Sequence, residues 1–287
     1  MAVDVFTFER IERRRKHAGM SRRKLRKPAK WLHPRAIERE YQRHLGRYAN
    51  NLSRVVNEII VPELPALVRA VDADRPGDRK DVFNWATEVA DLVEEAAIGM
   101  EPYFDATIVL VEPFAFKVSE YNQEQWQKVL RSVLGVDVFV AEPWLESLVT
   151  SFRIENVKLI KDISDKALND IEGLVQRGLR AGQRHEELAK QIQKVTGFAK
   201  TRSQIIARDQ ISKLNGNLTR LRQSGLGIKR YIWQTSLDER VRPTHAQNEG
   251  VEFKWNDPPG TGNPGEDVLC RCTGDPVFES SSGLAGV

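Results

Sequence analysis

The spacing of apolar residues changes once along this chain of 287 residues, and that change constrains the fold more than any other feature. Over residues 34–224, apolar residues recur at intervals typical of helices that bury one side. After Gly227 they alternate, and the segment 229–236 places Tyr231 and Trp233 on one face of a half-buried strand. The chain is therefore predicted to be α+β and predominantly helical, with a small β-rich module near its C-terminal end.

Shifts in composition and clusters of Pro and Gly divide the chain into five predicted segments. They are a basic, flexible arm (1–30), an N-terminal and mostly helical region (31–142), a second helical region (143–225), a β-rich module with a Cys-x-Cys motif (226–278) and a flexible tail (279–287). Two more short strands are predicted at 251–255 and 275–278. The sequence has no stretch of about 18 uncharged apolar residues, so no membrane span is expected.

Helix boundaries in the two helical regions follow from proline, glycine and the apolar stripes. A helix is predicted over 34–61, and the next is predicted to end between Gly99 and Pro102. The β-branched runs at 107–111 and 136–140 fit either short strands or pieces of buried helix. Further helices are predicted over 185–195 and 201–224.

Positive charge is concentrated in the N-terminal arm. Residues 10–30 contain eleven Lys and Arg side chains but one acid, Glu12, whereas the whole chain has a net charge of +4. So little apolar surface cannot offset the entropy of ordering, which predicts a flexible arm or a solvated charged helix. We expect such an arm to bind nucleic-acid phosphates or an acidic protein surface. The residues assigned to this contact are Arg13, Arg14, Arg15, Lys16, Arg22, Arg23, Lys24, Arg26 and Lys27.

The β-rich module contains both cysteines of the chain, Cys270 and Cys272, together with His245. Thiolate and imidazole are the groups that zinc prefers, so these three residues form a candidate zinc site. Because a structural zinc ion usually has four ligands, the fourth would be water or a carboxylate. The candidate carboxylates are Asp238, Glu266 and Asp267. Alternatively, His245 is a hydrogen-bonded structural histidine and the cysteines are small buried groups.

The same residues allow an enzymatic interpretation, because His245 with either cysteine could form a nucleophile–base pair. Asp238, Glu239 or Glu266 would then orient the histidine. However, the sequence contains no recognisable feature that would stabilise an oxyanion. No catalytic residue is therefore assigned, and a DNA-processing or hydrolytic enzyme using His245 and Cys270 or Cys272 stays as the alternative function.

An ordered set of residues in the module goes beyond composition. The pattern W-x(4)-D-x-R-V-R-x-x-H is followed by N-P-G-E-D-x-x-C-R-C and a closing P-V. Its main residues are Trp233, Asp238, Arg240, Arg242, His245, Pro264, Gly265, Glu266, Asp267, Cys270, Arg271 and Cys272. This pattern resembles the phage Mu F-like head morphogenesis family, the minor head proteins of tailed bacteriophages, and the resemblance covers roughly residues 150–278.

The resemblance implies a structural protein of the virion, located inside the capsid at the portal vertex and in the host cytoplasm during assembly. Its implied roles are head assembly, DNA packaging or genome ejection. Its implied partners are the portal protein, the major capsid or scaffolding protein, and genomic DNA, which we expect the basic arm to contact. The resemblance implies no enzymatic activity, cofactor or membrane, so the zinc hypothesis depends on His245, Cys270 and Cys272 alone.

Overall fold

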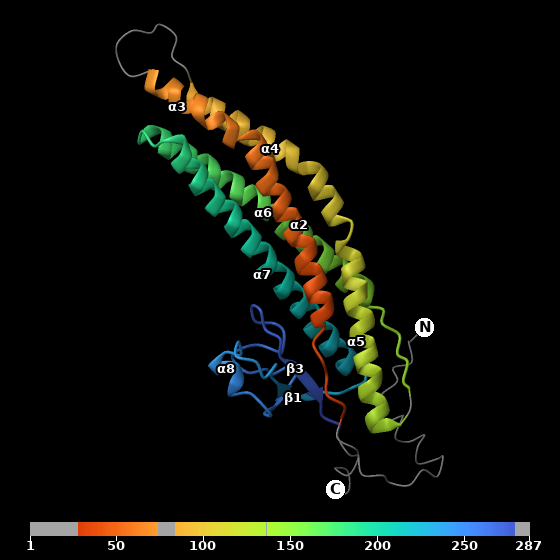
Figure 1. Cartoon of the computed structure of the whole chain (residues 1–287). Helices are drawn as coiled ribbons and strands as arrows, with labels where there is room; N and C mark the ends of the chain where they lie inside the picture. Colours follow the sequence, from red (N-terminus) through yellow and green to blue (C-terminus); the bar gives the residue numbers. More distant parts are fainter. Residues whose placement is uncertain (1–27, 74–83, 136, 279–287) are drawn as a thin grey trace, which may run out of the picture. The chain divides into compact units, whose positions relative to one another are not determined.

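The computed structural model describes residues 28–73, 84–135 and 137–278 (Figure 1). The nine basic residues assigned to an anionic partner and the predicted tail lie outside these ranges. The chain divides into two compact units, which we call unit 1 and unit 2. Unit 1 comprises residues 1–38, 114–152 and 209–287, and unit 2 comprises 39–113 and 153–208.

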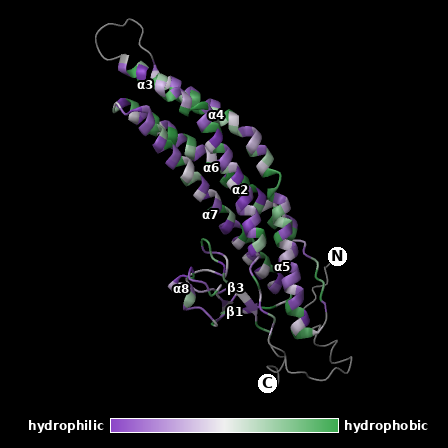
Figure 2. Cartoon of the chain, viewed as in Figure 1, coloured by the Kyte–Doolittle hydropathy of each residue, from purple (hydrophilic) through white to green (hydrophobic). Residues whose placement is uncertain are grey.

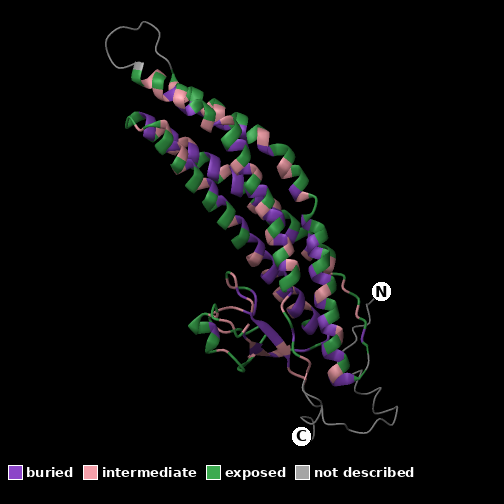
Figure 3. Ribbon diagram, viewed as in Figure 1, coloured by how far each residue is buried: buried purple, intermediate pink, exposed green. Residues whose placement is uncertain are grey.

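The described residues are mostly helical and include one small antiparallel sheet, which confirms the predicted α+β class. The longer helices have hydrophobic and hydrophilic residues in alternation along the ribbon (Figure 2), and buried and exposed residues alternate in the same way (Figure 3). No helix in the described ranges is both long enough and apolar enough to cross a membrane. The helices are α2 (Arg35–Ile59), the 3-10 helix η1 (Val61–Glu63), α3 (Leu64–Ala73), α4 (Trp85–Ile108), α5 (Val111–Leu134), α6 (Leu145–Arg180), α7 (His185–Gly225) and α8 (Pro243–Ala246).

Unit 2 is built from helices whose buried faces also contain paired polar groups. Tyr41 of α2 donates a hydrogen bond to the side chain of Asn156 on α6. About two turns further along both helices, the hydroxyl groups of Tyr48 and Ser164 share a hydrogen bond. Burial raises the pKa of both tyrosines, so their hydroxyls keep the protons that they donate. These bonds satisfy buried polar groups and fix the register of α2 against α6.

Two predicted helix boundaries are wrong. The second helix does not end at Gly99–Pro102, because α4 continues through Pro102 to Ile108. Pro102 lies on an exposed side of α4, where water can satisfy the carbonyl group that a proline leaves without its helical donor. Likewise, 185–195 and 201–224 form one helix, α7, with Gly197 in its interior. A single glycine costs a helix only about 1 kcal/mol, which the buried residues on either side of Gly197 offset.

The two β-branched runs contain no strand in their described residues. Residues 107–111 form the end of α4, a two-residue turn and the start of α5. After α5, the chain from 137 to 140 is irregular, and the Gln127 side chain takes the place of a neighbouring strand there. Its amide nitrogen donates to the Val138 carbonyl at 2.7 Å, and its oxygen accepts from the Val138 N–H at 3.3 Å.

Unit 1 contains an apolar core formed mainly by α5 and by the segments before α2 and after α7. Trp31 packs against Trp126 with their ring centroids 5.7 Å apart. Leu130 of α5 and Leu226, which follows α7, belong to the same cluster and are also buried. A buried polar group lies beside this core: Arg222 of α7 bonds Glu142, and α5 supplies its other acceptors. These contacts join α5, α7 and the segment before α6.

The sheet lies in unit 1 and has the strand order β2–β1–β3, with both pairs antiparallel. Its strands are β1 (Arg230–Gln234), β2 (Glu252–Lys254) and β3 (Thr273–Pro276). Tyr231 and Trp233 of the central strand are fully buried, which confirms the predicted alternation. Both pack in a cluster with Trp255, Cys270 and Cys272, so the cysteines lie in the core of the module.

Candidate functional site

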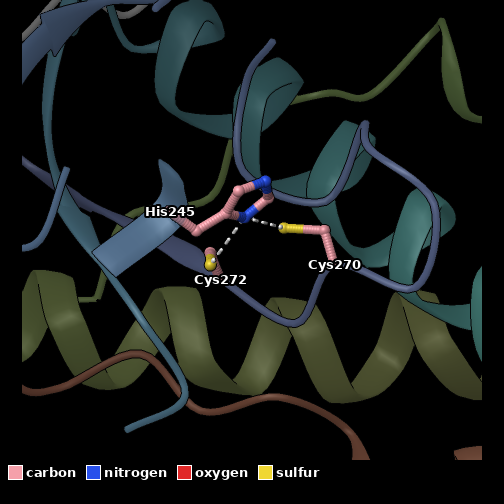
Figure 4. A group of neighbouring side chains, drawn as sticks. All are labelled: His245, Cys270 and Cys272. Atoms are coloured by element: carbon pink, nitrogen blue, oxygen red, sulfur yellow. Dashed lines mark hydrogen bonds between the residues drawn. The ribbon is translucent and has the colours of Figure 1, made fainter. Parts of the chain in front are cut away.

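His245, Cys270 and Cys272 meet in the β-rich module, and Figure 4 shows their side chains pointing toward one another. Pro243 starts the short helix α8 with its fixed φ angle, and His245 lies two residues later. The two cysteines flank Arg271 in the segment that leads into β3. All three residues are buried, with 3–6% of their surface exposed.

The ligand atoms of these residues are close enough to interact directly. The Nδ1 atom of His245 lies 3.5 Å from the sulfur of Cys270 and 3.5 Å from the sulfur of Cys272. The three ligand atoms all lie within 4.8 Å of one another. The structure thus brings together the three residues that the sequence selected as candidate zinc ligands.

Asp267 orients the histidine from its other side. The Asp267 carboxylate lies 3.0 Å from His245 Nε2 and also pairs with Arg242. Burial raises the pKa of Asp267, but the Val268 N–H, the Arg242 guanidinium and the His245 hydrogen bond outweigh burial and lower it. An ionised Asp267 accepts the Nε2 proton, which assigns the tautomer and leaves the Nδ1 lone pair facing the two sulfurs.

The two thiols differ in acidity because they share a hydrogen bond. A hydrogen bond from the Cys272 thiol and another from the Gly265 N–H lower the pKa of Cys270 to about 6, although burial opposes them. The same bond to Cys270 holds the Cys272 proton and, together with burial, raises the pKa of Cys272. The arrangement therefore favours one thiolate, at Cys270, beside the neutral imidazole.

Helix α7 supports the loop that carries Cys270. The N–H of Leu269 donates to the Asp209 carboxylate on α7 at 2.9 Å. Gly216 allows the loop to approach the helix, because a Cβ atom there would lie 2.5 Å from the Pro264 carbonyl oxygen. Gly265 contacts the helix with a φ angle of +91°, which few residues other than glycine adopt. The Pro264–Gly265 pair of the motif therefore permits close packing.

Arg271, between the two cysteines, is half-buried and forms an ion pair with the buried Glu38. Its Nε atom donates to Glu38 at 3.1 Å, and a second guanidinium nitrogen bonds the other carboxylate oxygen. His33 also donates to Glu38, at 2.7 Å, and Asp238 lies 3.7 Å from Arg271. Burial lowers the pKa of His33, so at neutral pH it is a neutral donor. This network ties the start of α2 to the segment between the cysteines.

The carboxylates proposed as a fourth zinc ligand all have other partners. Glu266 accepts from the backbone and the side chain of Asn263. Asp238 pairs with Arg271 and accepts from the Arg240 N–H, and Asp267 bonds the far nitrogen of His245. None of the three belongs to the cluster of ligand atoms formed by the described residues.

Sequence reasoning missed three residues that shape this site. Asp267 was considered only as a metal ligand, whereas it is the carboxylate that contacts His245. Glu38 and Asp209 lie on helices far from the motif in sequence, at positions where an acid on a helix normally faces solvent. The sequence around Glu38 and Asp209 contains no pattern that identifies Arg271 and the Leu269 N–H as their partners.

Chemically, the site can do one of two things. Two thiols and an imidazole within bonding range of a common point can hold a soft or borderline metal ion such as Zn²⁺. Alternatively, the order Asp267, His245 and Cys270 could activate a thiol as a nucleophile. Burial favours the first, because a nucleophile must contact a substrate and the Cys270 side chain is almost inaccessible, with 4% of its surface exposed.

Comparison with known proteins identifies a family over part of the chain. Residues 169–274 match the family model described as Phage Mu protein F like protein, which confirms the resemblance over this region. An uncharacterised protein of Haemophilus influenzae is 34% identical over 172 residues, covering 58% of this chain and 38% of that protein. An uncharacterised protein of Methanocaldococcus jannaschii is 30% identical over 175 residues, covering 55% of this chain and 28% of that protein. The chain thus spans well under half the length of these relatives, and no solved structure matches it significantly.

Proposed function

We propose that the chain acts in the phage head as a minor structural protein, because its residues 169–274 belong to the phage Mu F-like family. The family match is the single observation that carries the proposal. The matched region includes all of α7, the strands β1 and β2, the first two residues of β3, and the cluster of His245 and the two cysteines. The proposed roles are head assembly, DNA packaging or genome ejection.

The buried contacts of the matched region support a structural rather than a catalytic role. The conspicuous charged residue of the motif, Arg271, is held by Glu38 inside the protein. His245, Cys270 and Cys272 are likewise buried. Such contacts support a role for these residues in stabilising the module.

The proposed partners are the portal protein, the major capsid or scaffolding protein, and genomic DNA. The basic residues between Arg10 and Lys30 support the DNA contact, because cations that neutralise phosphates release condensed counterions. The proposed location is the virion interior at the portal vertex, with a cytoplasmic stage during assembly. Each of these partners extends the family match and needs its own measurement.

The central test is made in the phage or prophage that encodes the chain. Deleting the gene should stop the production of filled heads, and a plasmid copy should restore it. Mass spectrometry of purified heads should find the protein at low copy number, and cryo-electron microscopy should place it at the portal. Normal, infectious heads without the protein would refute a role in the head.

The arm is tested separately with a variant that lacks residues 1–30. If the arm binds DNA, the full chain should bind duplex DNA with an affinity that falls steeply as salt increases, and the variant should lose most of that slope. If the arm instead binds an acidic portal or scaffold surface, crosslinking in procapsids that lack DNA should detect it. An unchanged DNA affinity and salt slope would remove the DNA proposal while leaving the role in the head intact.

A second candidate function, a thiol hydrolase or DNA-processing enzyme, has one observation in its favour. Asp267 contacts His245, and His245 contacts Cys270, in the order that a nucleophilic thiol requires. Such an enzyme needs an accessible thiolate, so native Cys270 should react with iodoacetamide within minutes at pH 8. If the role is structural, as we propose, Cys270 should react only when the protein is unfolded. Rapid alkylation of the native protein would favour the enzyme.

A further inference from the structure

We propose that the β-rich module binds one Zn²⁺ ion through Nδ1 of His245 and the sulfur atoms of Cys270 and Cys272. The proposal goes beyond the role in the head and does not depend on it. It rests on three buried side chains that converge from two separate segments, α8 and the approach to β3. Figure 4 shows both sulfur atoms beside the same ring nitrogen of His245.

The distances fit a tetrahedral zinc ion. Zinc binds thiolate sulfur at about 2.3 Å and imidazole nitrogen at about 2.0–2.1 Å, which at tetrahedral angles separates nitrogen from sulfur by about 3.5 Å. Both distances from His245 Nδ1 to the sulfurs, of Cys270 and of Cys272, are 3.5 Å. These two distances are therefore the ones expected when a single ion binds the nitrogen and each of the sulfurs.

Hydrogen bonding alone does not account well for this arrangement. A neutral imidazole whose Nε2 proton is donated to Asp267 has one lone pair, at Nδ1, for two thiols. That lone pair can accept only one S–H proton at full strength, so a hydrogen bond to Nδ1 explains the position of one sulfur, whereas both sulfurs lie 3.5 Å from it. A zinc ion replaces both thiol protons and uses every lone pair that points to the centre.

Groups around the cluster are placed as they are around other zinc ligands. A histidine that binds zinc usually donates its other nitrogen to a carboxylate, and Asp267 lies 3.0 Å from His245 Nε2. The Gly265 N–H donates to the sulfur of Cys270, which stabilises a thiolate. In addition, the indole N–H of Trp233 is buried without an ordinary hydrogen-bond partner. A thiolate at Cys272 would accept a hydrogen bond from it.

The fourth position of the ion is assigned to water. Asp238, Glu266 and Asp267 are held by other partners, and the described residues place no other acid, histidine or cysteine in the cluster. A site with two thiolates favours zinc over Mg²⁺ or Ca²⁺, which require oxygen ligands. Because the ligands come from α8 and from the segment before β3, the ion would pin two loops of a small three-stranded module together.

The test uses the full chain, expressed in rich medium and purified without chelators or added metal. Elemental analysis should find about one zinc per chain, and Co²⁺ exchanged into the protein should show thiolate-to-cobalt charge transfer and tetrahedral visible bands. Cys270→Ser, Cys272→Ser and His245→Gln should each reduce zinc affinity at least about 100-fold. The matched control, His185→Gln, alters a half-exposed histidine outside the cluster and should retain full occupancy.

Asp267→Asn provides a second, milder variant that keeps all three ligands. Loss of an outer carboxylate typically weakens zinc binding about 10–100-fold, so competition with a chromogenic chelator should show a shift of that size while the cobalt spectrum keeps its shape. Zinc below about 0.1 per chain after loading and dialysis would overturn the proposal. A folded Cys272→Ser variant that binds zinc as tightly as the wild-type protein would also overturn it. The cobalt spectrum of the wild-type protein tests the proposal even if the variants do not fold.

Discussion

Replacing Arg222 with Met tests whether a single buried guanidinium holds unit 1 together. Arg222 has five N–H groups, and the structure gives each of them an acceptor. Glu142 accepts two of the bonds, at 2.7 and 2.9 Å, and the other three go to Ser119 and Asn122 on α5. Methionine fills a similar volume but donates nothing, so the substitution removes the bonds and leaves their acceptors in place.

The expected cost follows from what remains buried. Breaking a buried ion pair from one side costs about 3–5 kcal/mol, because the remaining charge has lost its partner. The Arg222 side chain is 1% exposed and that of Glu142 is 16% exposed, so water can partly reach the carboxylate. We therefore expect about 3 kcal/mol. Changing both residues, as Arg222→Met with Glu142→Leu, should recover part of this loss, because no unpaired charge is then left behind.

Urea unfolding measured by tryptophan fluorescence gives the required readout. Unit 1 contains five of the six tryptophans, namely Trp31, Trp126, Trp144, Trp233 and Trp255, so the signal reports mainly on that unit. The control is Arg131→Met, which breaks an exposed pair between Arg131 of α5 and Asp137 and should cost about 1 kcal/mol or less. If Arg222→Met shifts the urea midpoint no further than the control at equal slope, the reasoning about Arg222 fails.

Three more predictions concern the surroundings of the site. Burial raises the pKa of Glu38, but hydrogen bonds from His33 and Arg271 outweigh it and lower the pKa from 4.5 to about 2. About 3 kcal/mol of stability should therefore be present above pH 4.5 and be lost as the pH falls toward 2, and Glu38→Gln should flatten that part of a plot of stability against pH. Gly216→Ala should destabilise unit 1 because its Cβ would strike the Pro264 carbonyl, whereas Gly197→Ala, with no atom within 4 Å, should stabilise its helix by about 1 kcal/mol; thermal unfolding measures both. A chelator should lower the melting temperature of the wild-type protein and leave that of the Cys272→Ser variant unchanged, as calorimetry can show.

The strand β1 shows what the sequence could predict. Alternation is a local property, and Tyr231 and Trp233 are large apolar residues separated by one position, so their shared buried face follows from strand geometry alone. His245, Cys270 and Cys272 could likewise be selected by residue type. Their convergence to 3.5 Å could not be predicted, because it depends on how α8 and the loop before β3 fold around the sheet.

Helix α7 shows why local signals fail over longer distances. The sequence predicts two helices, 185–195 and 201–224, but the cost of the one glycine between them, Gly197, is small against the burial of Ile192, Ala199 and Ile206 on the same helix. Similarly, 136–140 has the composition of a strand, yet Gln127 satisfies the backbone of Val138, and a side-chain partner of this kind leaves no periodic pattern. In both cases, a tertiary contact decided between local alternatives.

The region that matches the family is not expected to fold by itself, and this follows from the partners of the buried Arg222 and the half-buried Arg271. Arg271 pairs with Glu38, and Arg222 pairs with Glu142 and bonds Ser119, all of which lie outside residues 169–274. A fragment limited to that region would leave both guanidinium groups without partners, at a cost of about 3–5 kcal/mol each, which is comparable to the whole stability of a small domain. We therefore expect residues 169–278 to be unfolded or aggregated by circular dichroism and gel filtration, whereas 28–278 should fold. A monomeric, cooperatively unfolding 169–278 fragment would show that the contacts with Glu38 and Glu142 are dispensable for this part of the fold.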